Sequence, residues 1–197
     1  MKKTLYLMRH GETVFNKQDL VQGACDSPLT EVGRTQPLYA KRWFADQGIK
    51  FDHAYASTQE RASDTLELIT EMPYQRLKGI KEMSFGIFEA TPNRFVRAAC
   101  NLHENPEALT KFGGEGMYAV QNRVVNTLTE LMKKPDHQTV LAVSHGCAIF
   151  TFAYKWIAGI TWEKFHLTNC VILKFEYEDE QFKFIEMINH DFDQPLT

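Results

Sequence analysis

The sequence predicts an α/β protein, and two short apolar runs near its ends are the clearest indication. Residues 5–8 and 140–143 are continuously apolar and rich in strand-forming residues, as expected for strands buried on both faces. Each run leads into a histidine-glycine pair, His10-Gly11 and His145-Gly146. Between the two runs, strand patterns alternate with helical patterns, which is typical of a layered α/β fold. The 197 residues suffice for one domain with a substantial core.

Turn residues and hydrophobic periodicity define the remaining elements. Thr30 is a candidate N-cap of a helix that Gly48 would end, and Pro37 should kink or shorten this helix. Ser57 and Glu60 have capping-box spacing, so we expect a helix to begin there. The expected helices are 30–47, 57–71, 91–102, 117–133 and 148–158, and the expected strands are 5–8, 51–56 and 140–143, with a hairpin of 170–175 and 182–187.

Composition and charge restrict the partners that we expect. With 25 acidic and 22 basic residues the net charge is −3, which gives no general attraction to nucleic acid or to an anionic membrane. We find no signal peptide and no membrane span, and therefore expect a cytoplasmic protein. The cysteines lack C-x-x-C spacing, so we expect reduced thiols and no zinc site at Cys25, Cys100, Cys147 and Cys170. The oligomeric state stays open.

An ordered set of short motifs runs through the chain. It begins with Leu7-Met8-Arg9-His10-Gly11-Glu12-Thr13 and ends with Ser144-His145-Gly146. Between these lie Asn16, Gln22-Gly23, Asp26-Ser27-Pro28-Leu29-Thr30-Glu31-Val32-Gly33, Ser57-Thr58-Gln59-Glu60-Arg61-Ala62, Glu82-Met83-Ser84-Phe85-Gly86 and Gly113-Gly114-Glu115. In this set the chain resembles the histidine phosphatase superfamily, which includes cofactor-dependent phosphoglycerate mutases and many phosphomonoesterases. The resemblance implies a three-layer α/β/α sandwich with a mixed, mainly parallel sheet, as in phosphoglycerate mutases.

The resemblance also implies roles for individual residues. His10 would be the nucleophile that becomes phosphorylated, and Arg9, Arg61 and His145 would hold the phosphoryl group. Glu82, the acidic residue before Phe-Gly, would be the proton donor. Further candidate contacts to phosphate or substrate are Asn16, Gln22 and Gly23.

Physical chemistry supports these roles independently of the resemblance. A neutral imidazole can attack phosphorus through one ring nitrogen when a hydrogen bond fixes the other. The planar fork of an arginine binds two phosphoryl oxygens at once and keeps its charge. The helix expected around Arg61 adds free N–H groups and the positive end of its dipole. Because two guanidiniums and a histidine carry the charge, we expect neither a metal ion nor a cofactor.

Residues 77–118 lose regular patterning, and we expect an insertion there that faces the substrate. Its phenylalanines suggest an organic phosphate with an apolar body, although each phenylalanine alone fits core packing better. Two departures from the family pattern fall in this segment, where Ala90 replaces the glycine of Phe-Gly-x-x-Glu-Gly and Gly116 replaces the serine of Gly-Glu-Ser. These departures leave open which leaving group the protein accepts. They do not change the phosphoryl chemistry that we expect.

We therefore expect one histidine phosphatase domain over residues 1–197 that hydrolyses a small-molecule phosphate ester through a phosphohistidine on His10. A cofactor-dependent phosphoglycerate mutase is the first alternative. The second alternative is a weakly catalytic module that binds a phospho-ligand or regulates. In such a module we expect another residue in place of His10, Glu82 or one of the arginines, and the sequence keeps all of them. The physiological substrate stays open.

Overall fold

The computed structural model describes residues 2–102, 104–162, 164–193 and 195–196. A six-stranded sheet lies at its centre, in the order β3 (Tyr74–Leu77), β2 (His53–Ser57), β4 (Thr139–Ser144), β1 (Lys3–Arg9), β5 (Ile172–Glu178) and β6 (Gln181–Ile188). The first four strands in this order are parallel to one another. The last two strands pair antiparallel. The predicted mixed, mainly parallel sheet is confirmed.

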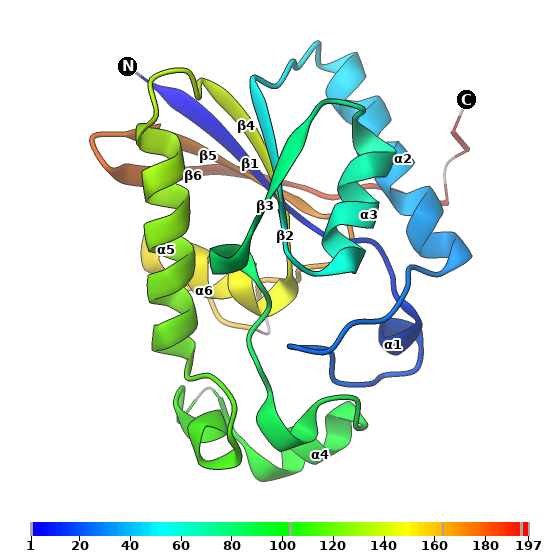
Figure 1. Ribbon diagram of the computed structural model, residues 1–197, viewed down its shortest axis with the longest axis vertical. Helices are drawn as coiled ribbons and strands as arrows, with labels where there is room; N and C mark the ends of the chain where they lie inside the picture. The colour runs from blue at the N-terminus through cyan, green and yellow to red at the C-terminus, as the bar shows by residue number, and fades with distance from the viewer. Residues whose placement is uncertain (1, 103, 163, 194, 197) are drawn as a thin grey trace.

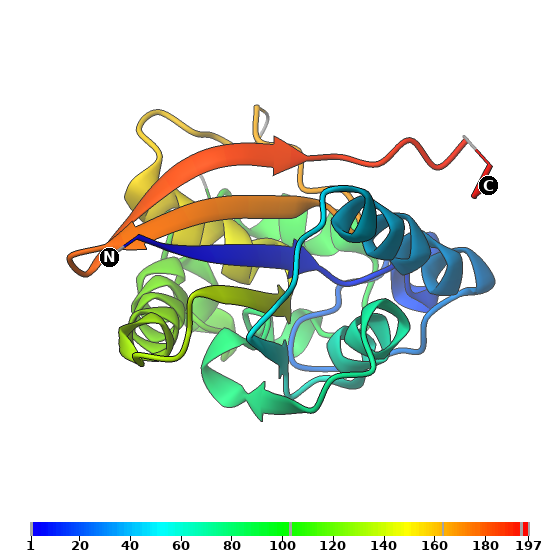
Figure 2. The same cartoon turned by 90° about the horizontal axis from the view of Figure 1, so that it is seen from above.

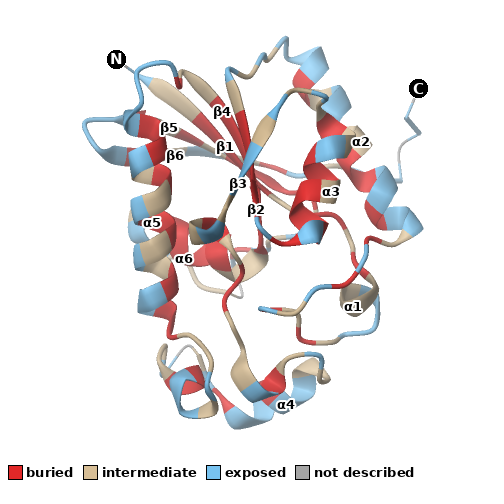
Figure 3. Ribbon diagram, in the orientation of Figure 1, coloured by how far each residue is buried: buried red, intermediate tan, exposed pale blue. Residues whose placement is uncertain are grey.

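Helices cover both faces of the sheet and complete three layers. Figures 1 and 2 show α2 (Glu31–Asp46) and α3 (Glu60–Ile69) on one face, with α5 (Met117–Lys133) and α6 (Gly146–Trp156) on the other. Alternate residues of β1 enter different cores, because Leu5 and Leu7 pack on the α5 side and Tyr6 and Met8 on the α2 side. The central strands are buried on both faces (Figure 3), which explains their continuous apolar runs.

Short elements lie beyond the carboxyl ends of the parallel strands. They are α1 (Val14–Lys17), α4 (Asn93–Ala99) and the 3-10 turns η1 (Lys78–Ile80), η2 (Gly86–Phe88) and η3 (Ala108–Phe112). All of these except α1 belong to the segment 77–118 (Figure 1). The single-domain organisation of residues 1–197 stays a prediction. Among the described residues, no helix is both long and apolar enough to cross a membrane.

The helix boundaries follow the sequence closely, with one wrong capping assignment. Thr30 caps α2 as expected, and its side chain accepts from the N–H of Gly33. The predicted capping box of Ser57 and Glu60 is wrong, because Gln59 is the N-cap of α3 and makes no side-chain cap. The Ser57 hydroxyl accepts from the N–H of Gln59 and contacts His145. The edge strand β3 has no counterpart among the predicted strands, since its polar residues gave no apolar run.

Pro37 does not shorten its helix, so that part of the prediction is wrong, and a kink at Pro37 stays a prediction. It lies inside α2, which continues to Asp46. Proline removes the N–H that would bond the carbonyl oxygen of Gly33 within the helix. This carbonyl lies against Gly11 instead, since a Cβ atom on Gly11 would be 2.2 Å from it.

The loop after β1 packs on α2 through two glycines. Besides the contact at Gly11, a Cβ atom on Gly33 would lie 1.8 Å from the carbonyl oxygen of Glu12. Backbone atoms cannot yield at such distances without moving the loop or the helix. Because neither glycine has a side chain, the loop that carries His10 can pack directly against α2, and this contact sets its position.

We predict that Gly33→Ala lowers the free energy of unfolding by about 1–3 kcal/mol through this clash. Helix propensity alone predicts the opposite sign, because alanine favours a helix over glycine by about 1 kcal/mol. Urea denaturation measures the difference. Val32→Ala, at a neighbouring exposed position of α2, is the control and should change stability by less than about 0.5 kcal/mol. A more stable Gly33→Ala protein would contradict the close approach.

Candidate active site

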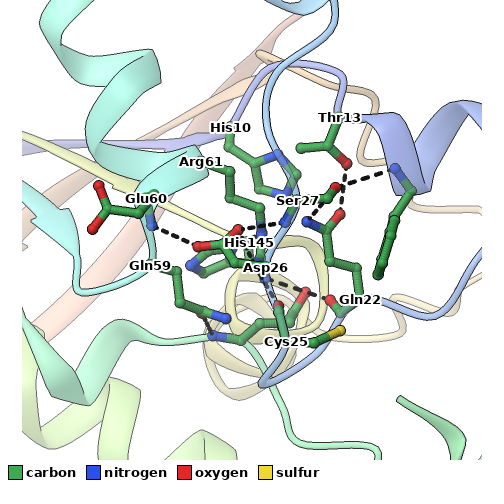
Figure 4. Close-up of polar contacts among 12 residues, drawn as sticks. His10, Thr13, Gln22, Cys25, Asp26, Ser27, Gln59, Glu60, Arg61 and His145 are labelled. Atoms are coloured by element: carbon green, nitrogen blue, oxygen red, sulfur yellow. Dashed lines mark hydrogen bonds and ion pairs between the residues drawn. The ribbon is translucent and has the colours of Figure 1, made fainter. Parts of the chain in front are cut away.

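The two histidines of the paired motifs lie together at the carboxyl end of the sheet. Strands β1 and β4 are parallel neighbours, with Arg9 opposite Ser144 in register, so the residues that follow them meet. The ring centroids of His10 and His145 are 5.2 Å apart, and both side chains are buried. Figure 4 shows the two rings side by side, with Arg61 next to them.

A cavity of about 730 Å³ opens over His10. Five predicted site residues line it, namely Arg9, His10, Asn16, Gln22 and Glu82. An apolar wall faces the same cavity and includes Phe85, Val96, Leu102, Trp162, Phe165 and Leu167. Among the described residues that line this cavity, no three potential metal-ligating side chains have their ligand atoms within 4.8 Å of one another.

The phenylalanines of the segment 77–118 serve different purposes. Phe85 lines the cavity. Phe88 and Phe112 pack edge to face with centroids 5.0 Å apart, so these two belong to the core. Phe95 is exposed beneath the guanidinium of Arg94. The aromatic residues of the cavity wall are therefore Phe85 and, after α6, Trp162 and Phe165.

The imidazole of His10 is neutral and has one nitrogen available. Its Nδ1 atom lies 2.7 Å from the carbonyl oxygen of Gly11, so Nδ1 carries the proton and donates it. Burial lowers the pKa of His10 well below its usual value, and the charges of Arg61 and Arg9 lower it further. The Nε2 atom therefore keeps its lone pair at neutral pH, as a nucleophile requires.

Arg9 provides an unsatisfied donor beside His10. Its Nη1 atom donates to the carbonyl oxygen of Leu167. Its Nε atom is buried and has no hydrogen-bond partner among the described residues. Burial lowers the pKa of Arg9, but a guanidinium remains charged at physiological pH. A buried charged donor without a partner is costly, and an anion in the cavity would satisfy it.

Arg61 is fully buried, and its guanidinium is hydrogen-bonded to other groups of the protein. The side chain lies in the first turn of α3, as predicted. Its Nη1 atom forms an ion pair of 2.8 Å with Asp26. The other acceptors are Nδ1 of His145 and the carbonyl oxygens of Gln22, Gly23 and Cys25 (Figure 4). Arg61 is therefore not placed on the cavity surface, and it holds the loop 22–26 against α3.

Both ring nitrogens of His145 are also engaged. Nδ1 accepts from Nε of Arg61 at 3.1 Å, so the proton is on Nε2, which donates to the Ser57 hydroxyl at 2.6 Å. Burial lowers the pKa of His145 well below its usual value, and the charge of Arg61 lowers it further. The predicted contact of His145 with a phosphoryl group thus requires Nε2 to leave Ser57.

Gly23 supports the loop and does not line the cavity. Its N–H donates to Glu89, and its carbonyl oxygen accepts from Arg61 and from Gln59 Nε2. Glu89 also accepts from the N–H groups of Ala24, Cys25 and Phe85. Burial opposes ionisation of Glu89, yet hydrogen bonds from the Cys25 thiol and these N–H groups hold its pKa below the usual value. This carboxylate joins the loop to the segment 77–118.

Asn16 and Gln22 present amide groups to the cavity. The side-chain oxygen of Asn16 accepts from the N–H of Thr13 and from Nδ2 of Asn169, which fixes the amide so that its nitrogen is the group left for a ligand. Gln22 accepts from the Thr13 hydroxyl and donates to Ser27. These hydrogen bonds hold both side chains in fixed positions beside His10.

Glu82 lies at the N-terminus of α6 and lines the cavity. Its Oε1 atom accepts from the N–H groups of Met83 and Ala148 at 2.9 Å, and Oε2 accepts from that of Cys147 at 3.0 Å. The free N–H groups of the helix thus hold the carboxylate.

Sequence reasoning missed the residues that position Glu82. The N–H of Glu82 donates to Gln59, and its carbonyl oxygen accepts from Arg123 at 2.9 Å. Arg123 also donates to Gly79 and Lys81 and binds the Glu115 carboxylate through two nitrogens. Glu115 was visible in its motif, but Arg123 carries no sequence signal beyond its place on the polar face of α5.

Comparisons with known proteins show which families this chain resembles. A probable phosphoglycerate mutase from Salmonella paratyphi A is 28% identical to this chain over 193 residues, covering 90% of this chain and 86% of that protein. Phosphoserine phosphatase from Entamoeba histolytica, solved with 3-phosphoglyceric acid, is similar with a TM-score of 0.81 at 24% identity, covering 95% of this chain and 98% of that one. Alpha-ribazole phosphatase from Shigella flexneri has a TM-score of 0.75 at 26% identity, with coverages of 92% and 94%.

The family assignment rests on the length of the match as well as on the motifs. The model of the histidine phosphatase superfamily (branch 1) matches residues 5–190, which include both histidine-glycine pairs and every motif between them. By this match, the chain belongs to the histidine phosphatase superfamily.

Proposed function

We propose that this protein hydrolyses a small organic phosphomonoester through a phosphohistidine on His10, without a metal ion. The observation that carries the proposal is the pairing of two groups in one cavity. His10 offers a neutral Nε2 atom, and Arg9 offers a buried charged donor with no partner among the described residues. A nucleophile beside an unsatisfied cation is the arrangement that a phosphoryl group needs.

In the first half-reaction, Nε2 of His10 attacks phosphorus while the bond from phosphorus to the alkoxy oxygen breaks. Arg9 and the amide nitrogen of Asn16 stabilise the charge on the equatorial oxygens. Glu82 acts as the general acid and gives a proton to the departing oxygen, so the alcohol leaves neutral. The Nδ1 hydrogen bond to Gly11 keeps the His10 ring oriented and stabilises the charge that it gains.

In the second half-reaction, water attacks the phosphohistidine. Glu82, now a carboxylate, takes a proton from the attacking water, and the bond from phosphorus to Nε2 breaks. Inorganic phosphate leaves, and His10 returns to its neutral form. The same side chain thus acts as acid and then as base, and no proton is left over.

Arg61 and His145 act on the phosphoryl group mainly through charge and position. The Arg61 guanidinium lowers the pKa of His10, so its positive potential reaches the reacting nitrogen although its hydrogen bonds go to the protein. His145 reaches the phosphoryl oxygens when its Nε2–H exchanges Ser57 for the ligand. We propose this exchange as the step that admits phosphate.

The shape of the cavity favours an ester with an apolar body. The apolar wall includes three aromatic residues, Phe85, Trp162 and Phe165. The volume of about 730 Å³ is that of a site for a drug-sized ligand. Phosphoglycerate mutation, the first alternative, uses the same phosphate groups but a small, highly charged sugar acid that would leave the apolar wall without contacts.

We predict phosphate release from aromatic or otherwise apolar phosphomonoesters in the presence of a chelator, and little isomerisation of 3-phosphoglycerate. His10→Ala should reduce hydrolysis to background, whereas His53→Asn, at the opposite end of β2, is the matched control and should keep full activity. Rapid quench with labelled substrate should trap a label that is stable in alkali and lost in acid, as a phosphoramidate behaves. Isomerisation that depends on a bisphosphoglycerate primer, with almost no phosphate release, would instead establish a mutase.

We predict that Glu82→Gln slows phosphorylation of His10 far more with an alkyl phosphate than with p-nitrophenyl phosphate. An alkoxide needs the proton, for which general acid catalysis contributes about 10²- to 10⁴-fold, whereas the nitrophenolate leaves without it. Single-turnover rapid quench measures this half-reaction alone. The p-nitrophenyl substrate also serves as the control, because a displaced His10 would slow both substrates. Equal losses on both substrates would remove Glu82 from the acid role.

We predict that His10 stays neutral well below pH 6.5. Titration of its ring resonances by NMR, assigned by their absence in His10→Ala, should show no midpoint between pH 8 and about 6. Because the folded-state pKa lies below that of the unfolded chain, the unfolded chain binds more protons as the pH falls below 6.5. Stability is therefore fully present above that pH and declines below it, by up to about 1.4 kcal/mol per pH unit for each such histidine. A midpoint near 6.5 would contradict the neutral nucleophile.

A further inference from the structure

Three potential metal ligands meet at the end of the sheet opposite the candidate active site. His53 is the first residue of β2, and Asp136 and His137 lie in the turn before β4. Each side chain offers one ligand atom, and these atoms all lie within 4.8 Å of one another. The strands that carry His10 and His145 begin near this end and finish at the other (Figure 1), so the cluster takes no part in the proposed hydrolysis.

The carboxylate of Asp136 contacts both imidazoles. Nε2 of His53 lies 2.9 Å from Oδ2, and Nδ1 of His137 lies 2.8 Å from Oδ1. The two rings are stacked, with centroids 3.8 Å apart and an interplanar angle of 18°. Two ligand nitrogens of a tetrahedral zinc site are about 3.3 Å apart, given bonds of about 2.0–2.1 Å. Because the stacked rings hold their lone pairs nearly parallel, one ring must turn out of the stack for both nitrogens to point at one ion, and the partly exposed His53 is the ring that can turn.

The surroundings fix one ligand and leave another free to adjust. His137 is 2% exposed, and its remaining nitrogen contacts the Tyr55 hydroxyl at 2.7 Å. A hydroxyl both donates and accepts, so Tyr55 can partner either tautomer of His137 and orient the ring as an outer-shell group does. Asp136 is 64% exposed at its side chain, so its carboxylate can reorient to bind an ion through one oxygen at little cost.

The turn itself is anchored independently of any ion. One carboxylate oxygen of Asp52 accepts from the N–H groups of Gln138 and Thr139, at 2.9 and 2.7 Å. This pair of hydrogen bonds holds the turn against the start of β2. The ligand positions are therefore set by the fold before a metal arrives, which lowers the cost of binding.

We propose that Nε2 of His53, Nδ1 of His137 and one carboxylate oxygen of Asp136 bind a single Zn²⁺ ion. Two imidazoles and one carboxylate match the ligand preference of zinc, and water would complete the tetrahedron. The ion cross-links β2 to the turn before β4, two segments distant in the sequence. Its effect is on stability and not on hydrolysis, since the ligands are remote from the cavity over His10.

Isothermal titration of the untagged, chelator-treated protein with Zn²⁺ tests the site. We expect one saturable site and a rise in Tm at excess zinc. His53→Asn, at a partly exposed position, should weaken binding at least tenfold while preserving the fold. Tyr55→Phe, which keeps all three ligands, should weaken binding by about tenfold. His10→Ala is the control and should bind Zn²⁺ as the unaltered protein does.

NMR of the histidine rings identifies the ligands directly, because zinc should shift the resonances of His53 and His137 and leave those of His10 unchanged. The absence of saturable binding would overturn the proposal and leave the three side chains as a hydrogen-bonded cluster. Binding that persists undiminished in His53→Asn would also overturn it, since the ion would then lie elsewhere. Phosphatase activity is not the readout, so a failure of the proposed hydrolysis leaves this test intact.

Discussion

The buried guanidinium of Arg61 is the interaction on which the rest of the site depends. A fully buried charge is costly unless its donors are satisfied, and here the ion pair with Asp26, three carbonyl oxygens and His145 satisfy all of them. Asp26 in turn accepts from the N–H of Glu60 at the start of α3. One side chain therefore fixes the loop 22–26, the first turn of a helix and the tautomer of His145.

The two arginines of the site consequently differ in what they can do. Arg9 retains a buried donor without a partner among the described residues, so it can form a new bond to an anion. Arg61 has no such donor, but its charge contributes to lowering the pKa of both histidines. Keeping the imidazoles neutral and presenting a strong donor are separate tasks. Because a single arginine cannot be both enclosed by carbonyl groups and open to a ligand, two are needed.

The sequence predicts the elements that depend on local pattern. It does not predict contacts in which several groups compete for the same hydrogen-bond partner. The buried strands and α5 follow from apolar runs and periodicity, and the site histidines follow from adjacent motifs. Ser57 has capping-box spacing, but a buried imidazole takes its hydroxyl instead. Gly23 belongs to a motif, yet its N–H donates to Glu89 and its carbonyl oxygen accepts from Arg61. The cluster around Asp136 is invisible in the sequence, because its members come from distant segments.

The departures from the family pattern have local physical solutions in the segment 77–118, which also supplies part of the cavity wall. Ala90 adopts a φ of 60°, a left-handed conformation that costs an alanine about 1–2 kcal/mol, where the pattern has glycine. Gly116 caps α5 without a side chain, and a Cβ atom there would lie 1.8 Å from the Glu107 carboxylate. That carboxylate accepts from the N–H of Tyr118 and so replaces the missing serine cap. Both adjustments occur in the segment 77–118, while the groups around His10 keep the family residues. If this chain and its relatives accept different substrates, the segment 77–118 is therefore where we expect the cause, and not the groups around the phosphoryl site.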